Sequence, residues 1–288
     1  MADQQYPLPH VGLADVQLVL GATGAVPYTE LLAKAKAELT VALALDPDVD
    51  EAWTLMAVVH FYEWDFDASE RAVAKAIEIN PRLGHAHSVR ACNEMFRGRP
   101  DRAVPSAKLS VELDPLAMLW NGVLAYVQLA RGDRDASREC VGAMLDFDPE
   151  SWMAYYVRGL LLVADGRPSD AIAAFEKAVR FSGDAPLNLG PLACACGLAG
   201  DPDRARRILD DLVARAAQTF VPALPIALAH IGLGDLDAAI EWLEKSLAER
   251  DVWVTWAAWS PLFAATWSDP RMQDFLRRMK RLQEGRAA

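Results

Sequence analysis

The feature that most constrains this fold is an interval of 34 residues at which proline and glycine recur. Four prolines keep this interval, and each directly follows an aspartate or asparagine: Pro47, Pro81, Pro115 and Pro149. Five glycines have the same spacing: Gly98, Gly132, Gly166, Gly200 and Gly234. A fixed interval of this length indicates stacked copies of one supersecondary unit, each packing only on its neighbours. We therefore expect one elongated array and a role in binding rather than in catalysis.

The residues between these punctuation points predict two helices in every copy. In the copy that begins at Trp152, the small residues Gly159, Ala171 and Ala178 let two helices approach closely, and Phe175 fills the space beside them. Glycine past one helix end and proline at the next helix start is the expected asymmetry of helix termini. This pattern resembles the tetratricopeptide repeat, a helix–turn–helix unit of the same length. The resemblance implies an all-α fold, a right-handed α-solenoid.

We expect about seven tetratricopeptide-type helix pairs in a single domain that spans residues 1–288. Their expected bounds are about 9–47, 50–81, 84–115, 118–149, 152–183, 186–219 and 221–249. A further segment, 252–283, follows the last pair. Within it, Ser268, Asp269 and Pro270 form the start signal of a helix that runs to about Leu282 and that we expect to cap the array.

Charge and composition restrict the partners and the compartment. The chain has 40 acidic and 29 basic residues, and its net charge of −11 argues against a nucleic-acid partner held through its phosphates. The first ten residues lack the basic and apolar stretches of a signal peptide. No stretch approaches the roughly 18 apolar residues that a membrane span needs. Because four cysteines fit a reducing compartment, we expect a cytoplasmic protein with no membrane partner.

In tetratricopeptide arrays the first helix of each pair lines a concave groove, and the resemblance assigns mostly apolar side chains to that groove here. The candidate partner contacts are Phe61, Tyr62, Met95, Phe96, Tyr126, Tyr156 and Leu160. Lys, Arg and Asn, which some members use to bind a C-terminal carboxylate, are absent from the groove positions. We expect a protein or peptide segment to bind there. Two alternatives stay open: an apolar small molecule in the groove, or a groove covered by the chain's own packing or C-terminal segment.

Three tryptophans at intervals of three residues open the C-terminal segment: Trp253, Trp256 and Trp259. This spacing places them roughly on one stripe of a helix. One interpretation is a core that covers the exposed face of the last repeat. The other is an aromatic pocket or the contact of a homodimer in a self-associating scaffold, because tryptophan is enriched at binding hot spots.

The C-terminal part of the sequence has a second, narrower resemblance. Its residues are Gly234-Asp235, Trp242–Lys245, Glu249–Trp253, Pro261–Phe263 and Ser268–Met279. They resemble the terminal part of repeat regions in bacterial multidomain regulators. In those proteins a winged-helix DNA-binding domain, an adenylate-cyclase domain or a Ser/Thr kinase precedes a TolB-like segment and the repeats. The resemblance extends over residues 12 to 280 or so, and it implies a bacterial regulatory or signalling setting.

No residues stand in a pattern typical of catalysis or metal binding. His85 and His87 are two positions apart, so on a helix they point to different faces. Cys194 and Cys196 form one pair, without the second pair that a structural zinc site needs. The chain has no phosphate-binding GxxxxGK[ST] loop and no nucleophile elbow. We therefore expect no enzymatic activity, no metal and no cofactor.

Overall fold

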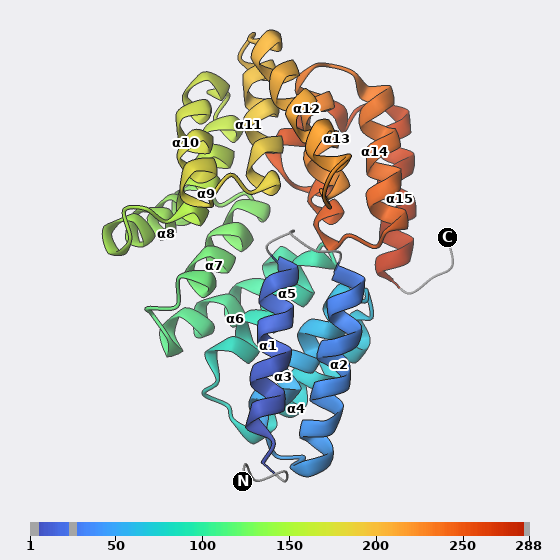
Figure 1. Cartoon of the computed structure of the whole chain (residues 1–288). Coiled ribbons are helices and arrows are strands. Elements are labelled where there is room, and N and C mark those ends of the chain that lie inside the picture. The colour runs from blue at the N-terminus through green and yellow to red at the C-terminus, as the bar shows by residue number, and fades with distance from the viewer. Residues whose placement is uncertain (1–5, 23–27, 285–288) are drawn as a thin grey trace.

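The computed structural model describes residues 6–22 and 28–284, and within these ranges the chain forms helices and no strands. Figure 1 shows the helices stacked as consecutive antiparallel pairs along a curved path. The expected all-α solenoid is confirmed. Among the described helices, none is both long enough and apolar enough to cross a bilayer.

Seven helix pairs follow one another in chain order, close to the expected bounds. They are α1 (Leu8–Ala22) with α2 (Tyr28–Leu45), α3 (Asp50–Tyr62) with α4 (Phe66–Ile79), α5 (Gly84–Phe96) with α6 (Pro100–Leu113), α7 (Met118–Ala130) with α8 (Arg134–Phe147), α9 (Trp152–Ala164) with α10 (Pro168–Phe181), α11 (Pro186–Leu198) with α12 (Pro202–Ala216), and α13 (Ala223–Gly232) with α14 (Leu236–Ala248). The C-terminal segment contains two 3₁₀ helices, η1 (Val252–Ala258) and η2 (Pro261–Thr266), and then α15 (Pro270–Gln283).

The turn within most pairs has the same local chemistry. A glycine at the end of the first helix has a φ between 72° and 87°, in the left-handed region that favours glycine: Gly98, Gly132, Gly166, Gly200 and Gly234. In three of these pairs the next residue is an aspartate whose carboxylate accepts a hydrogen bond from a backbone N–H of the second helix: Asp133, Asp201 and Asp235. Asp65 caps α4 in the same way, but it follows Trp64 rather than a glycine. The 34-residue interval is therefore the repeat of one helix–turn–helix geometry.

The closest approach of two helices lies near the end of the array. A Cβ added to Gly197 of α11 would lie 2.0 Å from the carbonyl oxygen of Gly232 in α13. The two helices therefore meet backbone to backbone, which only glycine permits at this point.

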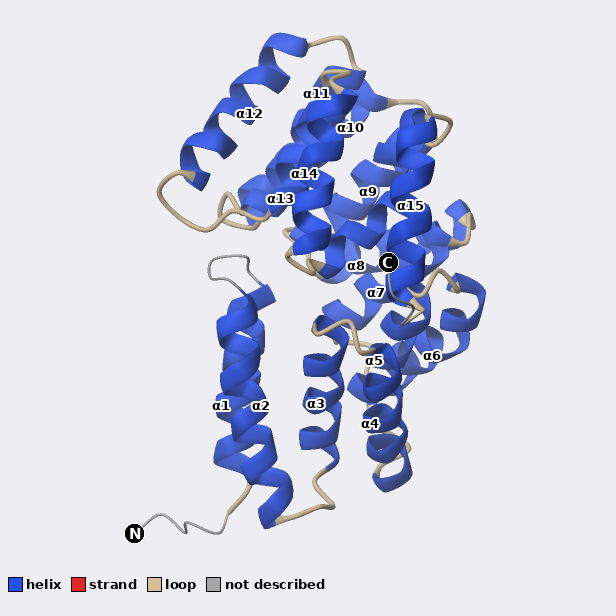
Figure 2. Cartoon of the chain, turned by 90° about the vertical axis from the view of Figure 1, so that its right-hand side faces the viewer, coloured by secondary structure: helices blue, strands red, loops and turns tan. Residues whose placement is uncertain are grey.

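The C-terminal segment turns back into the molecule. Figure 1 shows the segment passing from α14 to the inside of the curve, after which α15 packs beside α14. Figure 2 shows α15 on the face of the molecule that is turned to the viewer. Met272, Phe275 and Met279 of α15 are buried, and the Arg278 guanidinium donates to the carboxylate of Glu244 in α14 at 2.9 Å. One continuous core connects Phe61 of α3 to Met279 of α15.

Candidate partner-binding site

The seven predicted groove residues come from four first helices, α3, α5, α7 and α9. All of them except Tyr62 are buried, and none of those six side chains is more than 8% exposed. Burial raises the pKa of the Tyr126 and Tyr156 hydroxyls well above the ordinary value, so both are neutral. Tyr62 stacks on Tyr28 of α2 with 3.9 Å between ring centroids.

The chain's own tryptophans cover these groove residues. The ring of Trp256 lies 5.5 Å from that of Tyr126 and 5.7 Å from that of Tyr156, measured between centroids. Trp253 lies edge-to-face on Phe96 at 5.8 Å. These are ordinary distances for stabilising aromatic pairs. The C-terminal segment therefore fills the middle of the groove, which is one of the alternatives that the sequence left open.

The segment continues deeper along the groove as η2. This 3₁₀ helix packs against α9, α11 and α13, and Leu262 and Phe263 are almost completely buried there. The thiol of Cys194 in α11 lies 3.8 Å from the Leu262 carbonyl oxygen. Burial raises the pKa of Cys194 to about 12, so the group is a neutral thiol. Contact of the seven groove residues with a partner, and of the three tryptophans with a second chain, stay predictions.

The spacing of the three tryptophans has a local reason. We expected a helix with all three rings roughly on one stripe, and η1 is a 3₁₀ helix with three residues per turn, so side chains three apart eclipse one another. Neighbouring rings of Trp253, Trp256 and Trp259 accordingly lie 5.0 and 5.7 Å apart. They lie inside the groove rather than across the outer face of α13 and α14.

Three long-range hydrogen bonds attach the C-terminal segment to the second and third repeats. The indole N–H of Trp64 donates to the carbonyl oxygen of Arg250 at 2.8 Å, and Arg250 donates back to the carbonyl oxygen of Glu63 at 3.2 Å. The amide of Gln283 donates to the carbonyl oxygen of Phe96. Each bond joins residues 186 or 187 positions apart, so the C-terminal part of the chain is held against the second and third repeats.

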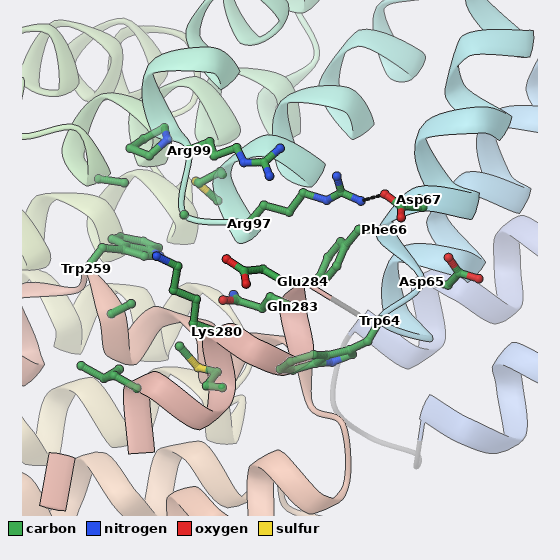
Figure 3. A pocket seen from close by; sticks show the side chains of 17 residues that line it. Trp64, Asp65, Phe66, Asp67, Arg97, Arg99, Trp259, Lys280, Gln283 and Glu284 are labelled. Atoms are coloured by element: carbon green, nitrogen blue, oxygen red, sulfur yellow. Dashed lines mark hydrogen bonds and ion pairs between the residues drawn. The ribbon is translucent and has the colours of Figure 1, made fainter. Parts of the chain in front are cut away.

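Beside this contact lies an open cleft of about 840 Å³. Its walls are the turn between α3 and α4, the turn between α5 and α6, and the exposed side of α15. The side chains that carry its chemistry are Trp64, Phe66, Met95, Arg97, Arg99, Trp259, Met279 and Lys280. In Figure 3, Trp64 and Trp259 stand on either side of the opening, with Gln283 and Glu284 between them. Of the residues predicted from the sequence, Met95 and Trp259 line this cleft.

The three basic side chains that line the cleft differ in how closely a carboxylate pairs with them. Arg97 forms an ion pair with Asp67, which lowers the pKa of that carboxyl, and its guanidinium lies 5.7 Å from the centre of the Phe66 ring. Arg99 comes no closer than 3.9 Å to Glu94. Lys280 is exposed and forms no ion pair within the described parts of the chain. Arg99, whose ion pair with Glu94 is long, and Lys280 are therefore the cations placed to meet an anionic group beside the aromatic walls, and the carboxylates of Asp65, Asp67 and Glu284 also line the cleft.

Two cleft residues break the repeat pattern. Trp64 occupies the turn position that is glycine in the next five copies, and it adopts the same left-handed conformation with a φ of 64°. A bulky residue in this region costs of order 1 kcal/mol, which points to a use for its side chain. Arg99 occupies the position of the capping aspartate, and its helix α6 has no side-chain cap. The same arginine recurs at Arg167, away from the cleft, so the replacement of glycine by Trp64 was the signal that could have revealed the cleft from sequence.

Elsewhere the described residues offer little chemistry. No group of three His, Cys, Asp or Glu side chains is placed to hold a metal ion within residues 6–22 and 28–284. His85 stacks on Trp120 at 4.7 Å, and burial lowers its pKa to about 4. This histidine is therefore neutral near pH 7 and packs as an aromatic ring.

Comparison with known families finds tetratricopeptide-repeat models at three places along the chain. They match residues 123–186, 189–211 and 226–250. None of the curated proteins matches this sequence.

Solved structures share the fold at low sequence identity. The crystal structure of the APC/C hetero-tetramer Cut9–Hcn1 matches 95% of this chain at 15% identity with a TM-score of 0.61, and this chain spans only 48% of that one. A tetratricopeptide repeat protein from Parabacteroides merdae matches 87% of this chain and 93% of its own at 10% identity, with a TM-score of 0.58. PilW, a type IV pilus biogenesis factor, matches 72% of this chain and 94% of its own at 16% identity, with a TM-score of 0.56. The family matches and the shared fold together support a tetratricopeptide-repeat protein.

Proposed function

We propose that this chain is a protein-interaction module that binds a segment of a partner protein in the cleft between the second and third repeats and α15. Tetratricopeptide-repeat proteins are generally scaffolds for protein interactions. The observation that carries the proposal is the cleft itself, in which Trp64 is kept in a strained backbone conformation where the other copies have glycine. The middle of the groove is occupied by the chain's own tryptophans, so the partner contacts move to this opening.

The lining of the cleft defines the chemistry of the segment. Arg99 and Lys280 supply positive charge, and Trp64 and Trp259 supply flat apolar surface. A partner segment that carries a carboxylate next to an aromatic or aliphatic side chain complements both features. Among the predicted groove residues, Met95 lies buried in the wall of the cleft, and Phe96, Tyr126 and Tyr156 would support the cleft through their contacts with Trp253 and Trp256 of η1.

The repeat pattern supplies variants that separate binding from folding. Trp64→Gly restores the glycine of the next five copies, and relief of about 1 kcal/mol of backbone strain offsets part of the lost hydrogen bond to Arg250 and of the lost packing of the half-buried indole. Arg99→Asp restores a helix cap and should stabilise α6 by about 1 kcal/mol. Both variants should therefore fold as the native chain does while removing a wall and a cation from the cleft.

The test is capture of partners from an extract of the source cells on the immobilised protein. Arg167→Asp is the matched control, because it makes the same change at the same repeat position, at the start of α10 and away from the cleft. We expect a protein that the native chain and the Arg167 variant retain and that both cleft variants lose. Equal recovery by all forms would exclude the cleft, and recovery of no protein by any form would contradict the interaction module.

The setting of this interaction is part of the same proposal. The resemblance of residues 234–279 to repeat regions of bacterial regulators supports a bacterial regulatory or signalling system. The cysteines support a reducing, cytoplasmic compartment, because all four are free thiols. In such a system the module would recruit a partner without carrying out chemistry of its own.

A further inference from the structure

The first helix, α1, has two apolar faces, and only one of them is covered. Its inner face packs on α2 and α3 through Val11, Ala14 and Leu18, which are at most 7% exposed. Its outer face is also apolar, and Leu13, Val16 and Val19 there are 53%, 57% and 57% exposed. A helix that is hydrophobic on all sides is usually buried on all sides.

We use the name α1 face for the exposed apolar side chains of α1 and α2 together with Tyr6, which precedes α1; the ion pair of His10 and Glu38 joins the two helices. Its exposed apolar side chains are Tyr6, Leu8, Leu13, Val16, Val19, Val41 and Leu45. Figures 1 and 2 place α1 and α2 together at one side of the molecule, and in Figure 2 no labelled helix lies beyond them. Asp15 is the one Asp, Glu, Lys or Arg residue within α1.

In a repeat array each helix pair buries apolar surface against its neighbours. Among the described residues, α1 packs on α2 and α3 through its inner face, and its outer face presents apolar surface of the kind that the later pairs bury against one another. The seven side chains expose roughly 600 Å² together, at the upper end of the apolar patches on monomers and close to the roughly 800 Å² per partner of stable interfaces.

We propose that the α1 face is the interface of a homodimer, in which the α1 helices of two copies pack against each other. The exposed apolar area is about three quarters of one side of a standard interface, and an apolar stripe with Asp15 as its one charged neighbour in α1 can pack on a second copy of itself about a two-fold axis. Gly12 lies within the stripe with no atom within 4 Å of the position that a Cβ would occupy. Its missing side chain allows two helix backbones to come close.

The net charge of the chain gives this dimer a recognisable salt dependence. Each copy carries a net charge of −11, so the two copies repel one another at long range. Added salt screens that repulsion and strengthens the burial of apolar surface. The dimer should therefore tighten as salt is raised, whereas a complex held by ion pairs would weaken.

The test is analytical ultracentrifugation of residues 1–288 over a range of protein and salt concentrations. We expect a species of twice the mass of one chain, and we expect Val16→Glu to weaken dimerisation at least about a hundredfold by placing a charge in the apolar contact. Leu119→Glu in α7 is the matched control, because Leu119 is 52% exposed and lies far from α1. Circular dichroism of both variants checks that the helices are intact.

Each outcome decides the proposal. A dimer that Val16→Glu dissociates and Leu119→Glu leaves intact supports it. A chain that is monomeric at every concentration overturns it, also if the α1 face then binds a different protein. A dimer that both variants retain places the contact elsewhere and overturns it as well. The proposal stands apart from the cleft, because Trp64→Gly and Arg99→Asp should leave dimerisation unchanged.

Discussion

Replacement of Trp256 by alanine should destabilise the whole C-terminal half of the array. Trp256 is 8% exposed, and its ring contacts those of Tyr126, Tyr156, Trp253 and Trp259. Truncation of a buried tryptophan to alanine costs about 3–5 kcal/mol through lost transfer energy and the cavity that remains. A smaller contribution to the free energy of unfolding has the opposite sign. The buried indole N–H of Trp256 has no hydrogen-bond partner among the described residues, so its removal recovers about 1 kcal/mol. We therefore expect a loss of about 3 kcal/mol.

Urea unfolding followed by circular dichroism measures this loss. Trp256→Phe is the first matched variant, since it keeps an aromatic ring between Tyr126 and Tyr156 and removes the unpartnered N–H, so it should cost less than about 1.5 kcal/mol. Trp152→Ala is the second, because Trp152 is 39% exposed and should cost less than about 1 kcal/mol. If Trp256→Ala cost no more than Trp152→Ala, the side chain would not lie inside the groove and the reasoning would fail.

Three further predictions follow from single contacts. Gly197→Ala should cost more than about 2 kcal/mol in thermal unfolding, because its methyl group would overlap the backbone of Gly232, whereas Gly142→Ala, with open space beside it, should stabilise the chain by about 0.5–1 kcal/mol. Burial raises the pKa of Asp251 to about 6, so the protonated carboxyl stabilises the fold at low pH, and that contribution is lost as the pH rises through 6. In urea titrations, Asp251→Asn should therefore raise the free energy of unfolding by about 2 kcal/mol at pH 8 and hardly at all at pH 4. Arg99→Asp should raise the unfolding free energy by about 1 kcal/mol, and no gain would mean that α6 already has its cap.

The sequence predicted the repeats well because each of their signals is local. Glycine in a left-handed turn, aspartate at a helix start and proline at a first turn act within a few residues of themselves. The bounds of α3 to α14 follow from these signals at intervals of 34 residues. The helix expected from Pro270 to about Leu282 ends at Gln283 for the same reason.

The path of the C-terminal segment could not be predicted in this way. The contacts of Trp253 and Trp256 join positions more than a hundred residues apart, such as Trp256 and Tyr126, and no local pattern encodes them. The sequence did show that the groove was apolar without cations, which fits a surface covered by the chain's own tryptophans. The cleft was missed because Trp64 and Arg99 each look like ordinary turn residues until they are compared with the same positions in the other copies.

The α1 face was visible in the sequence only as a lack of charge. Between Leu8 and Ala22 the helix has apolar residues on both sides, which is equally typical of a helix in the middle of an array. The missing cover becomes apparent when the structure places α1 at one side of the molecule, as in Figure 2. Position in the array, rather than composition, thus distinguishes an internal helix from a binding surface.

The central claim is that the chain's own C-terminal segment fills its concave groove, and a double-mutant cycle between Tyr126 and Trp256 tests it most directly. The free energies of unfolding of Tyr126→Leu, Trp256→Leu and the double variant give the coupling between rings 130 positions apart, whose centroids lie 5.5 Å from each other. Because such aromatic pairs contribute about 0.5–1.5 kcal/mol beyond their buried area, we expect a coupling of about 1 kcal/mol. Strictly additive effects would contradict the account and would leave the groove open to a partner.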